Sequence, residues 1–355
     1  MPKPVAEQVA VVVGASTGIG RATALAFAAR GARVVCAARN AVALHTLVDQ
    51  IRKDGGTATA VPTDVADPAA VRALADAAEQ EFGRIDTWVN NAAVSIWGRI
   101  EDITDEEFDR VIRVNFLGQV HGVHAALPAL RRAGGGVLIG VASVEGIRSV
   151  PLHAPYTASK FALRSFYDTL RIELAQSGDP IAVTTILPAS IDTPLFEHGR
   201  SKIDAMPKPP PPVYAPELVA DAIVAAAERP RREVAVGGAA VGFYLGQRLS
   251  PALTDALMSI RRLGAGSQQS DRPDNQLDNV DRPLGEPGQV RGTYSGRVLR
   301  RSVLTRVMSA APRPGELLTA AVRRANARRA QATEGSGRPA GARSVPRRPV
   351  DSPAG

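Results

Sequence analysis

The sequence predicts an α/β protein whose core is a doubly wound parallel sheet of about seven strands. Short apolar runs alternate with longer segments of helical periodicity through the first 263 of its 355 residues. A glycine-rich turn directly follows the first apolar run. Aromatic residues make up only 4% of the chain, so small aliphatic side chains must fill the core, which suits close packing of helices on a sheet. Regular strand–helix alternation implies a parallel sheet with helices on both faces.

The first strand, turn and helix form a single unit. Val9–Val13 is a continuous apolar run, as expected for a strand buried on both faces. The chain continues with the turn Gly14-x-x-x-Gly18-x-Gly20, a helical pattern over residues 21–30 and a second apolar run at Arg33–Ala38. Glycines let the backbone approach a pyrophosphate closely, and the N-terminus of the following helix supplies N–H donors. The unit therefore predicts a dinucleotide-binding turn; a tight turn without a ligand is the alternative.

The same alternation continues to residue 263. Thr104 and Glu107 have the spacing of a capping box, in which each side chain bonds the backbone N–H of the other residue. Pro216 lies in the first turn of a later helical segment, a position that proline favours. Further strands are expected at Thr57–Pro62, 85–90, 137–142, 181–187 and Glu233–Val236. Further helices are expected at 41–54, Pro68–Phe82, 104–132, 155–177, 215–229 and 249–263.

Small or polar residues follow the predicted strands. They are Gly14, Asp64, Asn91, Ser143 and Pro188. The carboxyl ends of parallel strands meet at one edge of the sheet, and ligands bind at that edge in folds of this class. These residues are therefore expected to border one binding site.

Tyr156 and Lys160 lie four residues apart in a predicted helix and therefore share one helical face. A tyrosine hydroxyl has an ordinary pKa near about 10 and is a weak acid or base at neutral pH. A nearby ammonium favours the phenolate and lowers that pKa; closing about 3 pKa units takes about 4 kcal/mol. The pair is a candidate proton-transfer centre. A surface pair with no chemistry is the alternative.

In order and spacing these motifs resemble the short-chain dehydrogenase/reductase family over residues 5–240. The resemblance rests on Gly14-x-x-x-Gly18-x-Gly20, Asp64, Asn90-Asn91-Ala92-Ala93, Asn115, Ser143 and Tyr156-x-x-x-Lys160. Two residues depart from the family pattern, because Ala93 and Ala189 stand where the family usually has glycine. Each adds one methyl group to a backbone pocket near the nicotinamide end and leaves the chemistry intact.

The resemblance implies a Rossmann fold and an oxidoreductase that interconverts a ketone or aldehyde and an alcohol. Tyr156 would be the general acid or base, and Lys160 would lower its pKa and hold the nicotinamide ribose. Ser143 would hydrogen-bond the substrate oxygen, and Asn115 would position a water that links Lys160 to solvent. No metal is expected. Cofactor contacts are implied for Gly14, Ser16, Thr17, Gly18, Ile19, Gly20, Arg39, Asp64, Val65, Asn91, Ala92, Tyr156, Lys160, Pro188, Ile191 and Thr193.

The end of the second predicted strand bears on the choice of cofactor. A carboxylate there would bond the ribose 2′-hydroxyl of NAD, and none is present in residues 37–40. Arg39 can instead clamp a 2′-phosphate, so NADP is the predicted cofactor; a solvated surface arginine is the alternative. The substrate pocket is expected to be walled by Val94, Ser95, Trp97 and residues 145–153 and 191–214, with His153 as a wall residue.

Charge, cysteine content and apolar runs predict the partners and the cellular location of the chain. Residues 1–263 hold equal numbers of basic and acidic side chains, so the net charge of +8 lies in residues 264–355, and no nucleic-acid partner is expected for the body. Cys36 is the only cysteine, which excludes an intrachain disulfide. The first residues show no apolar signal segment, and the run 234–246 is too short to span a bilayer. A soluble cytoplasmic protein is expected.

Residues 1–263 are expected to form one catalytic domain, and residues 264–355 a basic tail. The stretch 264–296 is rich in Gly, Pro and Asp and is expected to be disordered. Basic amphipathic patterns at 298–310 and 316–329 suit short helices, either solvated or touching an anionic membrane. Homodimers or homotetramers are expected through the helices at 104–132 and 155–177. A cofactor-binding scaffold with little turnover is the alternative to an enzyme.

Overall fold

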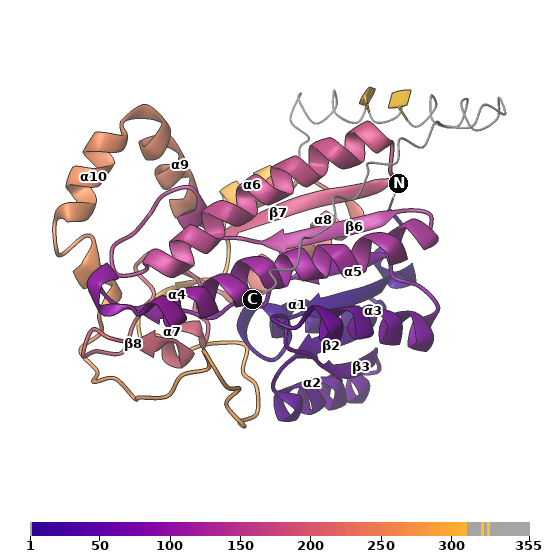
Figure 1. Cartoon of the computed structure of the whole chain (residues 1–355), viewed down its shortest axis with the longest axis horizontal. Helices are drawn as coiled ribbons and strands as arrows, with labels where there is room; N and C mark the ends of the chain where they lie inside the picture. Colours follow the sequence, from indigo (N-terminus) through magenta and orange to yellow (C-terminus); the bar gives the residue numbers. More distant parts are fainter. Residues whose placement is uncertain (1, 311–320, 323–324, 327–355) are drawn as a thin grey trace, which may run out of the picture.

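The computed structural model describes residues 2–310, 321–322 and 325–326 (Figure 1). Its centre is a seven-stranded sheet in the order β10-β7-β6-β4-β1-β2-β3, with every neighbouring pair parallel. The prediction of a doubly wound parallel sheet of about seven strands is confirmed. The strands are β1 (Val9–Val13), β2 (Arg33–Ala38), β3 (Thr57–Pro62), β4 (Thr87–Asn90), β6 (Gly136–Val141), β7 (Ile181–Pro188) and β10 (Glu233–Val236).

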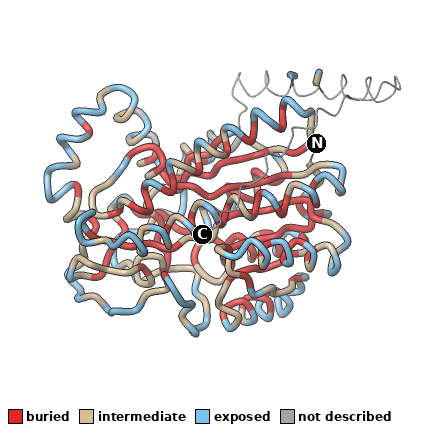
Figure 2. Tube along the Cα trace, viewed as in Figure 1, coloured by how far each residue is buried: buried red, intermediate tan, exposed pale blue. Residues whose placement is uncertain are grey.

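Helices cover both faces of the sheet and bury one apolar core on each. One core joins the sheet to α1 (Gly18–Ala28), α2 (Ala41–Lys53) and α8 (Pro216–Glu228). The other joins it to α3 (Pro68–Phe82), α5 (Gly118–Arg132) and α6 (Ala154–Ser177). Figure 2 shows buried strands flanked by helices that are buried only on their inner side. All five residues of β1 are buried, as its continuous apolar run predicts.

Short elements lie mainly at the carboxyl edge of the sheet. They are β5 (Ile96–Trp97), paired with β8 (Arg200–Ser201); α7 (Leu195–His198); β9 (Val213–Tyr214), paired with β11 (Val298–Leu299); and the 3₁₀ turns Val5–Glu7, Ile100–Asp102, Val144–Gly146 and Ala265–Gln268. These pieces connect segments that are distant in sequence and form the walls above the sheet.

The predicted helix 104–132 divides into three parts. Thr104 caps α4 (Asp105–Ile112), and both hydrogen bonds of the capping box are present. A π-helical segment, Arg113–Leu117, then interrupts the α-helical pattern before α5 begins. The interruption contains Asn115, whose buried side chain bonds the backbone of Val94 outside the helix. Single-turn π segments often mark functional sites.

The predicted helix 249–263 is also different in the structure. Two helices, α9 (Ala239–Leu249) and α10 (Pro251–Ser259), form a hairpin that stands away from the sheet at the upper left of Figure 1. Ser250 separates them, since its side chain accepts a bond from the backbone N–H of Leu253 and Pro251 occupies the first turn of α10. These local capping signals override the continuous amphipathic pattern that suggested one helix.

In contrast to the disorder expected for residues 264–296, this segment lies along the body. Arg200 of the body forms ion pairs with Asp278 and Asp281, and the N–H of Gly18 donates to the carbonyl of Gln289. The segment is ordered because its carboxylates and backbone carbonyls meet arginine donors of the body. The helix expected at 298–310 begins later, as α11 (Val303–Ala310), and most of the helix expected at 316–329 lies outside the described residues.

None of the described helices is both long and apolar enough to cross a membrane.

Candidate active site

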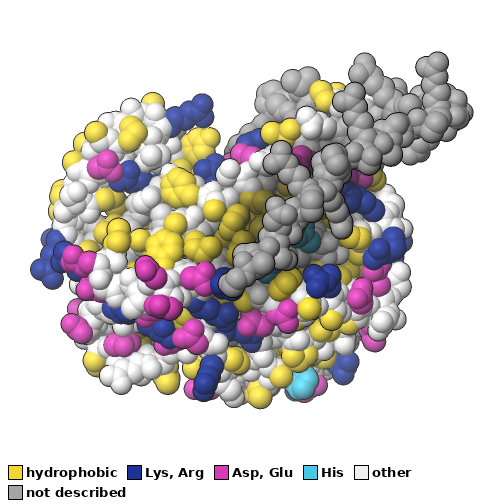
Figure 3. Space-filling model, viewed as in Figure 1, with side chains coloured by type: hydrophobic (Ala, Val, Ile, Leu, Met, Phe, Trp, Pro, Cys, Tyr) yellow, Lys and Arg dark blue, Asp and Glu magenta, His cyan; other side chains and the backbone are white. Residues whose placement is uncertain are grey.

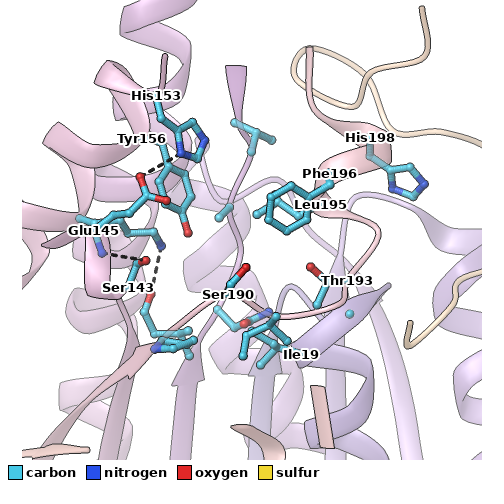
Figure 4. A pocket seen from close by; sticks show the side chains of 18 of the residues that line it. Ile19, Ser143, Glu145, His153, Tyr156, Ser190, Thr193, Leu195, Phe196 and His198 are labelled. Carbon is cyan, nitrogen blue, oxygen red and sulfur yellow. Dashed lines mark hydrogen bonds and ion pairs between the residues drawn. The ribbon is translucent and has the colours of Figure 1, made fainter. Parts of the chain in front are cut away.

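A cavity of about 620 Å³ opens at the carboxyl ends of the strands (Figure 4). It is bordered by both halves of the predicted site, the glycine-rich turn and the Tyr156–Lys160 pair. Two of the predicted site residues, Gly20 and Asn115, do not line it. The predicted residues that line it are Gly14, Ser16, Thr17, Gly18, Ile19, Arg39, Asp64, Val65, Asn91, Ala92, Ser143, Tyr156, Lys160, Pro188, Ile191 and Thr193.

The glycine-rich turn is shaped by close backbone approaches. Gly14 has φ +83°, and a Cβ placed there would lie 2.6 Å from the backbone of Ala92. A Cβ on Gly20 would lie 1.9 Å from the carbonyl oxygen of Gly14, so this position cannot hold a side chain. Thr17 is the N-cap of α1 but makes no side-chain capping bond. The N–H groups at the start of α1 therefore suit a cofactor pyrophosphate.

Tyr156 and Ser143 lie at one wall of the cavity (Figure 4), and Lys160 lines the same cavity. The Lys160 Nζ lies 5.1 Å from the centroid of the Tyr156 ring and donates a 3.1 Å hydrogen bond to the carbonyl of Val141. Ser143 follows β6, and its Oγ accepts a 3.1 Å bond from the Glu145 N–H. Both members of the Tyr156–Lys160 pair are buried, with Lys160 only 1% exposed.

The pKa of Tyr156 differs from the sequence-based expectation. Burial raises it strongly, and the Glu145 carboxylate raises it further, while a hydrogen bond with Ser143 acts in the other direction. The pKa of Lys160 is lowered to about 7 by burial, with Glu145 opposing the change. The rise in the pKa of Tyr156 caused by desolvation thus outweighs the lowering expected from the Lys160 ammonium, so Tyr156 is a protonated phenol at neutral pH.

Buried His153 and half-buried Glu145 form a pair beside Tyr156. The Nδ1 of His153 lies 2.9 Å from the Glu145 carboxylate, which also accepts a 2.9 Å bond from the Thr157 hydroxyl. The imidazole stacks on the Tyr156 ring with centroids 4.4 Å apart and on the Trp97 ring at 4.5 Å. His153 is thus a pocket-wall residue, as predicted, but it also fixes the plane of the Tyr156 ring.

Asn115 and Asn91 act on the walls of the site through the backbone. The Asn115 amide donates to the carbonyl of Val94 at 2.9 Å and accepts from its N–H at 2.8 Å. Asn91 donates to the carbonyl of Gly14 at 3.1 Å, which ties the end of β4 to the glycine-rich turn. Both asparagines therefore hold loops that border the cavity.

Residues 279–289, here called the strap, border the other end of the cavity. Arg39 donates to three strap carbonyls, those of Asn279, Val280 and Asp281. The N–H of Gly18 donates to the carbonyl of Gln289 at 2.8 Å. Sequence reasoning missed the strap because nothing in its composition points to these distant donors. The strap therefore hydrogen-bonds the Arg39 guanidinium, expected to bind a 2′-phosphate, and the Gly18 N–H, expected to bind the pyrophosphate.

Asp64 lies at the same end of the cavity. Its carboxylate accepts a 3.0 Å bond from the N–H of Ala66 and lies 3.5 Å from the Arg110 guanidinium. Arg110 also donates to the carbonyl of Val280 in the strap. Burial, together with the neighbouring Arg110, lowers the pKa of Arg39. Arg39 therefore lines this end with a second guanidinium, that of Arg110, close behind it, and this positive charge suits an anionic ligand.

Comparison with known proteins identifies the family. A sequence profile described as short chain dehydrogenase matches residues 8–204 of this chain. The chain belongs to the short-chain dehydrogenase family. The match places the glycine-rich turn, Ser143 and the Tyr156–Lys160 pair inside the family region, and relatives are named as oxidoreductases and reductases. The protein is an oxidoreductase with a Rossmann fold.

Individual relatives extend this finding. An uncharacterized oxidoreductase, YxnA of Bacillus subtilis (strain 168), is 39% identical over 91% of this chain and 92% of its own length. That match therefore extends well into the segment after residue 264. A short-chain dehydrogenase from Burkholderia phymatum solved with NAD has a TM-score of 0.63, 28% identity, and coverage of 70% of this chain and 94% of its own.

A second solved structure has a different ligand. The alcohol dehydrogenase of the archaeon Thermococcus sibiricus, complexed with 5-hydroxy-NADP, has a TM-score of 0.56 and 27% identity. The similarity covers 64% of this chain and 95% of that one. The two neighbours were thus solved with different nicotinamide cofactors.

Proposed function

We propose that this protein transfers hydride between NADP(H) and a carbonyl or secondary-alcohol substrate, with Tyr156 as the acid or base. One observation carries the proposal: Tyr156, Lys160 and Ser143 border the same cavity as the glycine-rich turn. An acid that meets a dinucleotide site at the carboxyl edge of a parallel sheet suits hydride transfer coupled to proton transfer. The bound nicotinamide would supply or accept the hydride.

Tyr156, Ser143, Lys160 and His153 each have a separate role in the proposed reaction. Tyr156 is protonated at neutral pH, since burial and Glu145 raise its pKa, so it can donate a proton to the substrate oxygen in the reductive direction. Ser143 presents a hydroxyl at the same wall and can hydrogen-bond that oxygen as charge develops on it. Lys160 would contact the nicotinamide ribose, and His153 keeps the Tyr156 ring in one orientation by stacking on it.

The substrate end of the cavity is mainly apolar. Val150 and Pro151 line one side, Leu195 and Phe196 another, and Phe243 of α9 a third. A buried apolar wall contributes about 25 cal/mol for each Å² of apolar ligand surface that it covers. We therefore infer that the substrate is a hydrophobic carbonyl compound or its alcohol, with the reacting oxygen near Tyr156.

The choice of NADP rests on Arg39. Its guanidinium lies at the cavity end opposite Tyr156, where a 2′-phosphate would make charge-assisted hydrogen bonds. In the structure its donors are engaged by strap carbonyls, which carry only partial charge. A doubly charged phosphate is a stronger acceptor than a carbonyl, so a 2′-phosphate is expected to displace these bonds.

The central test is NADPH consumption against a panel of hydrophobic ketones and aldehydes. Tyr156→Phe should lower kcat/KM by about 10²- to 10⁴-fold, the usual contribution of a general acid. Tyr244→Phe is the matched control, because Tyr244 is 37% exposed on α9, and it should retain wild-type activity. Undiminished turnover in Tyr156→Phe would refute the assigned role. NADPH binding without turnover across the panel would favour the scaffold alternative.

Cofactor choice is tested separately. The ratio of kcat/KM for NADPH to that for NADH should exceed one in the wild type and fall in Arg39→Asp. Arg72→Asp, on the exposed side of α3, controls for the change of charge and should leave the ratio unaltered. A wild-type preference for NADH would overturn the assignment to NADP.

We also propose that the chain forms a homodimer or homotetramer through α4, α5 and α6, the helices that correspond to the predicted segments 104–132 and 155–177. Exposed apolar side chains on this side include Leu117, Phe161 and Ile172. Light scattering coupled to gel filtration tests the proposal, and a monomeric mass at micromolar concentration would contradict it.

A further inference from the structure

The α9–α10 hairpin, residues 239–263, carries an unusual number of exposed apolar side chains. Leu253 and Leu257 are 60% and 43% exposed and share one face of α10, since they lie four residues apart, and Ile260, at the end of the helix, is 51% exposed. Leu249 at the end of α9 is 80% exposed, and Leu263 is 49% exposed. Exposed apolar groups gathered on one element mark an interaction surface.

The opposite side of the hairpin fixes it to the body. Arg148, which is only 8% exposed, donates to Gln247 of α9 at 3.0 Å and forms an ion pair with Asp255 of α10. Asp255 lies two residues from both Leu253 and Leu257, on the opposite face of the helix. The leucines therefore lie on the side of α10 opposite its contact with Arg148, and the hairpin stands at the margin of the molecule (Figure 1).

Positive charge accompanies the apolar face. Arg248, Arg261 and Arg262 are exposed, and none forms an ion pair with any residue that the structure describes. Asp255 is the only acidic residue between 239 and 263, and Arg148 engages it. Figure 3 shows hydrophobic side chains and basic groups side by side on this projecting part of the molecule. The surface is both apolar and cationic.

The apolar face is continuous with the cavity. Leu257 and Leu263 belong to the exposed face and also line the cavity, together with Met258 and Arg262. An apolar path therefore leads from the outer surface of the hairpin to the substrate end of the site.

We propose that the α9–α10 hairpin docks on a membrane surface that contains anionic lipids, and that its leucines enter the headgroup boundary. Apolar side chains flanked by arginines have the chemistry of an interfacial helix, whose apolar face enters the boundary while cations pair with lipid phosphates. A second copy of the chain fits less well, because a two-fold interface would bring the unpaired arginines of both copies together. This inference does not depend on the cofactor or on turnover.

The full chain is tested by co-sedimentation with large unilamellar vesicles of phosphatidylcholine with and without phosphatidylglycerol. Leu249→Glu is the informative variant, since Leu249 lies outside the cavity lining and is too exposed for its loss to affect the core. Ile100→Glu is the matched control, because Ile100 is 76% exposed on another part of the surface. Unchanged circular dichroism spectra and urea midpoints would show that both variants fold.

The expected result is binding to phosphatidylglycerol vesicles by the wild type and Ile100→Glu, with a partition coefficient about tenfold lower in Leu249→Glu. Binding should weaken as salt rises. No wild-type binding would overturn the proposal. Equal binding by Leu249→Glu would place the contact elsewhere, such as residues 298–329, and would also overturn it. A smaller oligomer in Leu249→Glu, without vesicle binding by the wild type, would assign the face to a second copy.

Discussion

Replacing Lys160 by methionine should make the protein more stable at neutral pH while abolishing its activity. Lys160 is 1% exposed, and burial lowers its pKa from 10.5 to about 7. A shift of that size corresponds to about 5 kcal/mol by which the folded state disfavours the ammonium, at about 1.4 kcal/mol per pKa unit. Methionine has similar length and no charge, so the variant is expected to lose this unfavourable term.

The same shift sets the pH dependence of stability. Between the folded pKa of about 7 and the unfolded value of 10.5, the unfolded chain binds a proton at Lys160 that the folded chain does not. The free energy of unfolding therefore rises with pH in this window, by about 2 kcal/mol from about pH 7 to about pH 9. Below the folded pKa both states are protonated, and the destabilisation by the buried ammonium is fully present.

Urea unfolding of the wild type and Lys160→Met at several pH values measures this difference. The wild type should gain stability from neutral to alkaline pH, and Lys160→Met should gain about 2 kcal/mol less over the same range. Lys53→Met removes an exposed lysine at the end of α2 and should keep the wild-type slope. The same slope in wild type and Lys160→Met would refute the inference that burial shifts this lysine.

Three further predictions follow from single contacts. Tyr167→Phe removes a buried hydroxyl that donates at 2.7 Å to a buried glutamine, and it should lower the free energy of unfolding by about 1–3 kcal/mol in urea. Gly288→Val would put a Cβ 1.9 Å from a carbonyl of the glycine-rich turn and unseat the strap, whereas Gly285→Val meets nothing within 4 Å. NADPH should therefore bind about tenfold more tightly to Gly288→Val than to Gly285→Val in a fluorescence titration, and equal Kd values would show that the strap does not compete. Glu145→Gln removes a carboxylate that raises the pKa of Tyr156, so the pH profile of kcat/KM for alcohol oxidation should move to lower pH; an unmoved profile would contradict that influence.

Local patterns were sufficient to predict the sheet. The continuous apolar run of β1 gives a strand buried on both faces in any parallel sheet, and strand–helix alternation determines where such a sheet has its helices. The capping box at Thr104 was also predictable, because its two hydrogen bonds join residues three positions apart. The positions of the glycine-rich turn and Tyr156 at one edge follow from the same topology.

Long-range contacts were not predictable in this way. The stacking of His153 between Tyr156 and Trp97 joins segments that no periodic pattern relates. The strap reaches Arg39 from about 240 residues away through backbone carbonyls, which every sequence possesses. Its composition, rich in proline and glycine, is typical of a disordered segment, so only the position of the arginine donors distinguishes the two.

The sequence by itself determined the family, the alternation of strands and helices in the central sheet, and many of the groups around the cavity. Only the tertiary structure decided the protonation of those groups. Four-residue spacing places Tyr156 and Lys160 on one face and predicts a lowered tyrosine pKa, but burial reverses that direction and lowers the pKa of Lys160 instead. The physical reason is that the Coulomb attraction between Tyr156 and Lys160 depends only on their distance, which the sequence spacing predicts. Their desolvation depends on all the segments that bury them, which only the tertiary structure brings together.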